Sequence, residues 1–239
     1  MQRLSLWTIL GIFLSLALLF VGTELVVGMG FMAVETWRHP KNDLALYVHA
    51  LSFDGVYFSV TTLARALFCA SLLAGFLKMQ GLSVARYLAL KKFAWSRYLF
   101  WQMALFAYLA VSEYGMQKLG FPVVHEFIET IYKNAGSLPL LWVALMIAAP
   151  LLEELVFRGF LYQGIATTRL AVPGAIIIPA MLWTLTHFQY HGIFMGIILG
   201  GGILLGLARW HMGSTLATLG LHASWNLIST LLAHYYLGS

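Results

Sequence analysis

The residues best suited to chemistry are two adjacent glutamates, Glu153 and Glu154, followed by Arg158 in an otherwise apolar stretch. Ionised side chains at membrane depth are costly, so three of them require partners, a hydrated cavity or a function. In a helix, Glu154 and Arg158 lie four residues apart on one face, in the order that favours an ion pair. Glu153 points about 100° away around the helix axis. This spacing predicts a paired, structural Glu154 and a Glu153 that is free to do chemistry.

Three more polar residues occur in the apolar stretches that follow. His187 comes four residues after Trp183, and His222 and Asn226 lie four residues apart on one face of a predicted helix. Between them, glycines recur at short intervals, at Gly192, Gly196, Gly200, Gly202 and Gly206. Small residues at such spacing let a neighbouring backbone approach closely. We therefore expect the helices that carry His187 and His222 to come together.

Each of these residues also has a purely structural explanation. The glutamates and Arg158 could form a buried polar network that locks helices together. His187 could cap a helix end or lie at the membrane interface. His222 and Asn226 could cross-link helices by hydrogen bonds, as such residues often do in membranes. Spacing alone leaves these alternatives open.

The overall composition is that of a membrane protein. Of the 239 residues, 61% are hydrophobic and 10% are charged, and the mean hydropathy is +0.83. A soluble domain of this size could not bury so much apolar surface, whereas membrane helices need apolar stretches of about 20 residues. The net charge of +5 is too small and too scattered to indicate nucleic-acid binding. The single cysteine, Cys69, excludes an intramolecular disulfide and a thiolate metal cluster.

The apolar stretches predict an all-α fold, a polytopic bundle of about seven transmembrane helices. The first stretch is too long for the hydrophobic region of a signal peptide, so we interpret it as a retained span. The expected spans are Trp7–Val34, Val56–Leu77, Tyr98–Lys118, Leu138–Ala166, Pro173–Tyr190, Gly192–Ala208 and Ser214–Tyr236. Without an internal repeat, the chain is expected to form one membrane domain, with accessory helices in residues 1–137 and catalytic helices in residues 138–239.

Loop charges predict the orientation in the membrane. Residues 78–97 contain five basic residues and no acidic one, so the positive-inside rule places this loop in the cytoplasm. The N-terminus, with Arg3, is then cytoplasmic, the turns with Arg169 and Arg209 are cytoplasmic as well, and the C-terminus lies outside.

Some polar residues outside the motifs suggest interfaces and helix ends. The segments Ser83–Tyr98 and Val123–Lys133 have the amphipathic pattern of helices that lie on a lipid surface. Glu24, Asp54 and Arg65 lie in or near apolar runs. We interpret these three as span-end or packing residues, with a role in substrate binding or gating as the alternative.

Taken in order, the polar residues resemble the motifs of a known family. Glu-Glu-x-x-x-Arg at Glu153–Arg158, an aromatic-x-x-x-His at Trp183–His187, and a glycine-rich span followed by His-x-x-x-Asn at His222–Asn226 make up the pattern. It resembles the CAAX protease and bacteriocin-processing enzyme family, also called Abi proteins, over about residues 138–233. The second motif usually begins with Phe, where this chain has Trp183. We expect this change to affect local packing more than catalysis.

The resemblance implies a glutamate-type intramembrane endopeptidase and assigns a role to each motif. Glu153 is expected to be the general base that deprotonates a water molecule. His187 is expected to hold the same water from the opposite side. His222 and Asn226 are expected to face the developing oxyanion, where fixed donors stabilise the transition state. The predicted ion pair of Glu154 with Arg158 is expected to orient the site.

The implied substrate is a membrane-associated peptide or protein within the lipid bilayer, with no nucleic-acid partner. The resemblance implies no metal cofactor. Zinc is the alternative, because carboxylates and imidazoles can bind it, although no His-Glu-x-x-His helix is present. A hypothesis of another class is a non-catalytic immunity or binding protein, or a small transporter with proton-carrying carboxylates. We expect a multi-pass protein of a prokaryotic inner or plasma membrane, and the substrate and the oligomeric state stay open.

Overall fold

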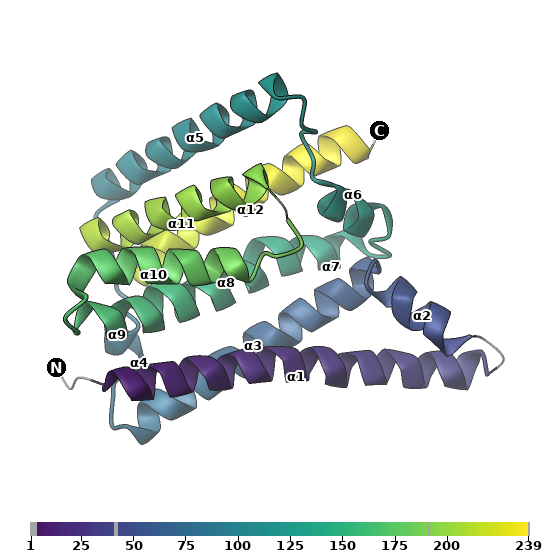
Figure 1. Ribbon diagram of the computed structural model, residues 1–239, viewed down its shortest axis with the longest axis horizontal. Coiled ribbons are helices and arrows are strands. Elements are labelled where there is room, and N and C mark those ends of the chain that lie inside the picture. The colour runs from purple at the N-terminus through teal and green to yellow at the C-terminus, as the bar shows by residue number, and fades with distance from the viewer. Residues whose placement is uncertain (1–3, 41–42, 191, 239) are drawn as a thin grey trace.

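The computed structural model describes residues 4–40, 43–190 and 192–238, and all regular elements in these ranges are helices (Figure 1). They form the predicted all-α membrane bundle. In Figure 1, α1 and α3 lie along one side, α5 lies on the other, and the helices of the C-terminal half lie between them. The elements are α1 Leu6–Arg38, α2 Leu44–Leu51, α3 Gly55–Met79, α4 Val84–Tyr87, α5 Trp95–Lys118, α6 Glu126–Lys133, α7 Leu138–Val143, η1 Ala144–Ala148, α8 Ala149–Glu153, η2 Glu154–Leu161, α9 Tyr162–Ala166, α10 Ala171–Leu185, α11 Ile193–Met212 and α12 Thr215–Leu237.

Five helices of the described part are long and apolar enough to cross a membrane. They are α1, α3, the continuous helix Leu138–Ala166, α11 and α12. The predicted number of seven spans is not confirmed, although each predicted stretch overlaps a helix. With 15 residues, α10 is about 22 Å long, which is shorter than the hydrocarbon core of about 30 Å. The 24 residues of α5 include the polar side chains of Arg97, Gln102 and Glu113.

Polar side chains fix the start of α3 and α12 and join α3 to α1. Asp54 accepts a hydrogen bond from the backbone N–H of Tyr57 at 2.7 Å, and Ser214 caps α12 in the same way. These caps satisfy N–H groups that have no partner within the helix. Glu24 of α1 and Arg65 of α3 form an ion pair. Asp54 thus has the span-end contact, and Glu24 and Arg65 the packing contact, that the sequence predicts.

The basic segment Ser83–Tyr98 does not form the predicted interfacial helix. Only α4 is helical before α5 begins. Tyr87 and Leu88 are buried, and burial raises the pKa of the Tyr87 hydroxyl to about 12. Ala89 has a φ of 51°, and its carbonyl accepts a hydrogen bond from the backbone N–H of Thr215 at 3.1 Å. The segment turns inward because its backbone supplies an acceptor for the start of α12.

The second amphipathic segment does contain a helix, α6, which is shorter than the predicted range. Its apolar residues Ile131 and Tyr132 are buried. The Tyr132 hydroxyl hydrogen-bonds to Nδ1 of His234 in α12 at 2.7 Å. This helix therefore packs against the end of α12, with Lys133 on its exposed side.

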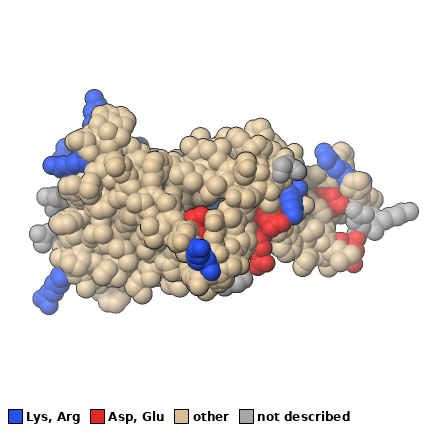
Figure 2. Space-filling view, turned by 90° about the horizontal axis from the view of Figure 1, so that it is seen from above, with Lys and Arg blue, Asp and Glu red and all other residues tan. Residues whose placement is uncertain are grey.

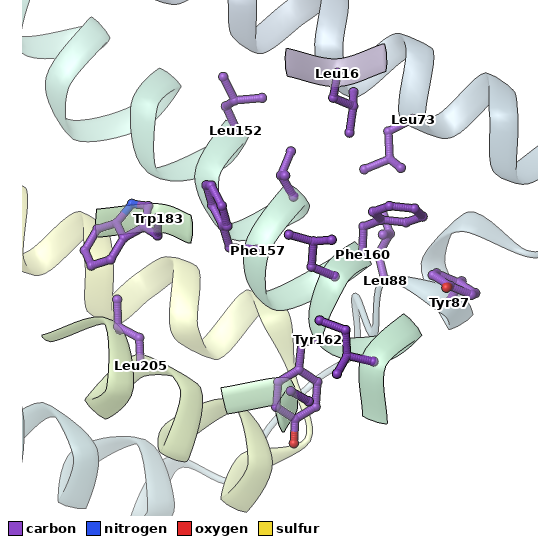
Figure 3. Packing of buried hydrophobic residues seen from close by; sticks show 14 of the residues in the cluster. Leu16, Leu73, Tyr87, Leu88, Leu152, Phe157, Phe160, Tyr162, Trp183 and Leu205 are labelled. Atoms are coloured by element: carbon purple, nitrogen blue, oxygen red, sulfur yellow. The ribbon is translucent and has the colours of Figure 1, made fainter. Parts of the chain in front are cut away.

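The hydrophobic core surrounds the continuous helix Leu138–Ala166, which we call the central helix. Its Phe160 is fully buried. Figure 3 shows Leu16 and Leu73 of the N-terminal helices on one side of it, and Trp183 and Leu205 of the later helices on the other. The central helix therefore has protein on several sides, which suits a helix that carries charged residues.

Glycines of α11 bring it close to both α10 and α12, as predicted. A Cβ atom at Gly202 would lie 3.0 Å from the ring of Trp183 in α10. Gly201 faces the ring of Trp225 in α12. Gly196, in contrast, has no neighbouring atom within 4 Å of its Cβ position, so it does not contribute to this contact. The close packing of α11 thus places α10 and α12 on the same side of the central helix.

Candidate active site

The site forms where the central helix changes its hydrogen-bonding pattern. The α-helix α8 ends at Glu153, and the π-helix η2 begins at Glu154. Such π segments are rare and are frequent at functional sites. The chain then turns between Ala166 and Ala171. Because Glu153 and Trp183 lie at nearly equal distances along the chain from this turn, they meet at the same depth of the bundle.

The predicted ion pair between Glu154 and Arg158 is present and buried. Arg158 Nη1 lies 2.9 Å from Glu154 Oε1, and the two residues are 1% and 0% exposed. Arg158 also donates from Nη2 to the carbonyl of Gly202 at 3.2 Å. A buried ion pair is tolerated only when such additional hydrogen bonds offset the loss of solvation. The pair therefore ties the central helix to α11 behind the site.

His222 lies between the two glutamates. Its Nδ1 is 3.0 Å from Glu154 Oε1 and its Nε2 is 3.7 Å from Glu153 Oε2. An ionised carboxylate only accepts hydrogen bonds, so Nδ1 carries a hydrogen and donates it to Glu154. This bond fixes the imidazole with Nε2 directed towards Glu153. His222 is 3% exposed, so the surrounding protein holds it in this orientation.

Glu153 is the more accessible of the two glutamates. Its side chain is 21% exposed, against 1% for Glu154. Trp183 Nε1 donates a hydrogen bond to Glu153 Oε2 at 2.5 Å. Within the described part of the chain, no hydrogen bond engages the other oxygen, Oε1. The two glutamates therefore divide as the helical spacing predicts, one paired with arginine and one with an oxygen left open.

His187 lies just beyond the end of α10. Its Nδ1 bonds to the carbonyl of Trp183 at 2.8 Å. Since a carbonyl cannot donate, Nδ1 carries the hydrogen and Nε2 is left for other partners. The ring packs edge-on against the indole of Trp183, with 5.1 Å between centroids. His187 thus has both a helix-end contact and a free ring nitrogen next to the site.

Asn226 lies one helical turn after His222 on α12. Its Nδ2 donates to the carbonyl of Leu145 in the π-helix η1 at 2.8 Å. One amide hydrogen therefore cross-links α12 to the central helix, which is the structural role that the sequence left open for Asn226. An amide nitrogen has two hydrogens, and the second makes no hydrogen bond within the described residues.

One cavity of about 1210 Å³ is lined by all four residues predicted to be catalytic, Glu153, His187, His222 and Asn226. The ion-paired Glu154 and Arg158 lie behind this lining. Apolar side chains from α1, α3 and α5 form the opposite walls, together with the ion pair Glu24–Arg65. Both halves of the chain therefore build the cavity, including the residues predicted to be accessory.

A zinc site would need three converging protein ligands. Within the described residues, no three His, Cys, Asp or Glu side chains are arranged to hold a metal ion. Glu154 Oε1 is already the acceptor for both Arg158 and His222. The donor set therefore does not fit the three-ligand zinc pattern.

Arg209 is a buried residue of the site that sequence reasoning misplaced on a cytoplasmic turn. It is 4% exposed and lies in α11. Its Nε donates to the carbonyl of Arg158 at 3.0 Å, and its guanidinium lies 4.7 Å from the ring centre of Tyr162. Arg209 thus binds a backbone group of the π-helix η2. Arg3, which is predicted to lie on the cytoplasmic side with the N-terminus, falls outside the described residues.

Trp183 has a contact that its position in the motif did not predict. The sequence interpretation expected the change to affect local packing more than catalysis, whereas the indole donates to the candidate base Glu153. The signal that could have revealed it is chemical, because tryptophan carries an N–H group that phenylalanine lacks.

The comparisons with known proteins agree with the motifs. The family described as Type II CAAX prenyl endopeptidase Rce1-like matches residues 135–228. This segment is less than half of the chain and includes all six residues predicted for the site. Neither the curated proteins nor the solved structures give a match. Over residues 135–228, the chain matches the CAAX protease family that its motifs predict.

Proposed function

We propose that the protein is an intramembrane endopeptidase that hydrolyses a peptide bond by glutamate-activated water. The observation that carries the proposal is the facing pair of Glu153 Oε2 and His222 Nε2, 3.7 Å apart on the wall of the shared cavity. This distance is too long for a direct hydrogen bond, so His222 Nε2 keeps the capacity to bind a water molecule or a substrate oxygen beside Glu153. The family match supports peptidase activity.

In the proposed first step, Glu153 takes a proton from a water molecule that His187 also holds through Nε2. The water oxygen bonds to the carbonyl carbon of the peptide, and the carbonyl electron pair moves to its oxygen. In its imidazolium form, His222 has a hydrogen on both nitrogens, so it donates to Glu154 and to this oxyanion at once. The second amide hydrogen of Asn226 is the other donor. Each such donor contributes about 3 kcal/mol to the transition state.

In the proposed second step, the electron pair on the oxyanion re-forms the carbonyl bond and the carbon–nitrogen bond breaks. The proton held by Glu153 passes to the leaving nitrogen, which gives a free amine and a carboxylic acid. Glu154 and Arg158 keep His222 in place during both steps through the buried bonds already described. The reaction needs no metal ion in this scheme.

The substrate we propose is a membrane-associated peptide or protein. The apolar walls of the cavity support this choice, since a lipid-facing or lipid-anchored chain can enter such a space. The matching family is described as CAAX prenyl endopeptidases, and we extend from this description only the cleavage of a membrane-anchored chain. Peptide precursors and membrane-anchored terminal signals of a prokaryotic cell are the candidates.

We propose that the N-terminus faces the cytoplasm. In Figure 2, the left end of the visible face carries basic side chains without acidic ones, whereas acidic and basic side chains lie together at the centre and right. This asymmetry fits the positive-inside rule. A cysteine introduced at the exposed Lys92 should react with a membrane-impermeant maleimide only after the cells are opened. If the cysteine at position 92 reacted in intact cells, the orientation would be opposite to the one proposed. The native Cys69 is buried, which keeps the background low.

The function is tested by comparing membrane-fraction peptide termini from cells with the wild-type protein and with Glu153→Gln. The proposal predicts that specific cleaved termini disappear in the variant while its amount in the membrane stays the same. The matched control is Glu129→Gln, which changes an exposed ion pair on α6 and should leave the termini unchanged. A Glu153→Gln strain with every terminus intact would contradict the proposal and favour the binding or immunity role.

A further inference from the structure

Trp183 contacts four side chains of the candidate site. Its Nε1 donates to Glu153 Oε2 at 2.5 Å. The Arg158 guanidinium lies 4.6 Å from its ring centre, and the rings of His187 and His222 lie edge-on to it at 5.1 Å and 5.3 Å. This indole therefore lies at the centre of the residues that the reaction would use.

The surrounding protein fixes the direction of the indole N–H. Trp183 is 2% exposed. Gly202 of α11 packs against the ring so closely that a Cβ atom there would lie 3.0 Å from Trp183 Cε3. The ring has little room to turn, so its donor points at one place. A hydrogen bond to an ionised carboxylate is also shorter and stronger than one between neutral groups.

We propose that Trp183 is a positioning residue for Glu153. The indole holds Oε2 on the side of His222, and this leaves Oε1 to take the proton from water. This inference rests on the proposed function, because the orientation of Glu153 affects a rate only if Glu153 is the base. It assigns Trp183 a role beyond filling space in the core. A carboxylate that turns freely would spend less time in the productive geometry.

The test replaces the indole with a ring that lacks the donor. Trp183→Phe keeps an aromatic side chain and removes the N–H, and its kinetics are measured on purified protein with a quenched peptide. Loss of a hydrogen bond to a charged group predicts a kcat about 10- to 100-fold below wild type, with KM changed by no more than about twofold because substrate contacts remain. A purely structural role would not separate kcat from KM in this way.

Trp142→Phe is the matched control. The Trp142 Nε1 atom is buried and has no hydrogen-bond partner within the described chain, and Trp142 is not part of the cavity lining. The same change there should leave kcat and KM at wild-type values. If Trp183→Phe also keeps its kcat within about twofold of an active wild type, the positioning role is overturned and the proposed function is not affected.

A second measurement tests the hydrogen bond without catalysis. The indole N–H resonance of Trp183 is identified in a ¹⁵N-labelled sample as the signal missing from Trp183→Phe. It should move upfield in Glu153→Gln, because the acceptor loses its charge, and it should stay in place in Glu129→Gln. An unmoved signal in Glu153→Gln would overturn the inference. A wild type that cleaves nothing would instead contradict the proposed function, and the positioning role of Trp183 with it.

Discussion

The imidazole of His222 donates from Nδ1 to the buried carboxylate of Glu154 at 3.0 Å. Glu154 is held in turn by Arg158 at 2.9 Å. A carboxylate that fixes the tautomer and direction of a histidine is a recurring arrangement in hydrolases. In this chain it directs the opposite nitrogen of His222 towards Glu153. Glu154 thus acts on Glu153 indirectly, because it orients the imidazole of His222, which lies on another helix.

Breaking the buried ion pair should destabilise the protein. Arg158→Met leaves Glu154 without its cation, and such a change typically costs about 3–5 kcal/mol. Unfolding in mixed micelles, followed by circular dichroism, measures the loss. The double variant Glu154→Gln/Arg158→Met should recover part of it, because no unpaired charge remains.

Lys133→Met is the control for this prediction. It breaks the exposed Glu129–Lys133 pair, and surface pairs contribute about 0–1 kcal/mol. If Arg158→Met were as stable as this control, the buried pair would not have the structural role described here.

Removing the imidazole of His222 should slow catalysis with little effect on substrate binding. Loss of one oxyanion donor typically lowers kcat by about 10²–10³-fold. We therefore expect His222→Ala to show this drop with a KM near the wild-type value. His234→Ala is the comparison, since His234 lies on the same helix, bonds to Tyr132 and does not line the cavity. Equal activity of the two variants would argue against the oxyanion role.

Glycine at position 202 should be required for the contact between α10 and α11. Gly202→Ala would place a methyl group 3.0 Å from the Trp183 ring, and such overpacking costs about 1–3 kcal/mol. Gly196→Ala offers the matched control, because open space surrounds that position. Alanine is the better helix former, so this control should be neutral or slightly stabilising in a thermal melt. A Gly202→Ala protein as stable as Gly196→Ala would show that the contact is looser than described.

Activity should persist without metal. Treatment with a strong chelator, followed by dialysis, is expected to leave the cleavage rate unchanged, because no three candidate ligands converge within the described residues. Lasting inactivation that added zinc reverses would contradict the metal-free mechanism.

Sequence reasoning predicted the helices well because long apolar stretches are unambiguous. All predicted spans except the fifth agree with their helices to within about four residues at each end, and the fifth extends beyond the end of α10 at Leu185. The pairing of Glu154 with Arg158 also followed from spacing, because side chains four residues apart still meet in the observed helix. The number of membrane crossings did not follow, since α5 and α10 are helical without being both long and apolar enough.

The remaining features depend on tertiary contacts that no local pattern records. Periodicity did not indicate the π-helix η2, and without it the carbonyl that Arg209 binds could not be foreseen. The inward turn at Ala89 depends on its hydrogen bond with Thr215, far along the chain. The bond from Trp183 to Glu153 likewise joins two helices. In each case, a polar group has a partner that is distant in sequence.

The central claim is that Glu153 activates the water that cleaves the peptide. The most direct test is the cleavage rate of purified Glu153→Gln in lipid vesicles, beside wild type and Glu129→Gln. We expect Glu153→Gln to be folded and inserted, to bind the peptide and to cleave it at a rate lower by about 10²–10⁴-fold, as for loss of a general base, while Glu129→Gln cleaves normally. Full activity of Glu153→Gln would contradict the account.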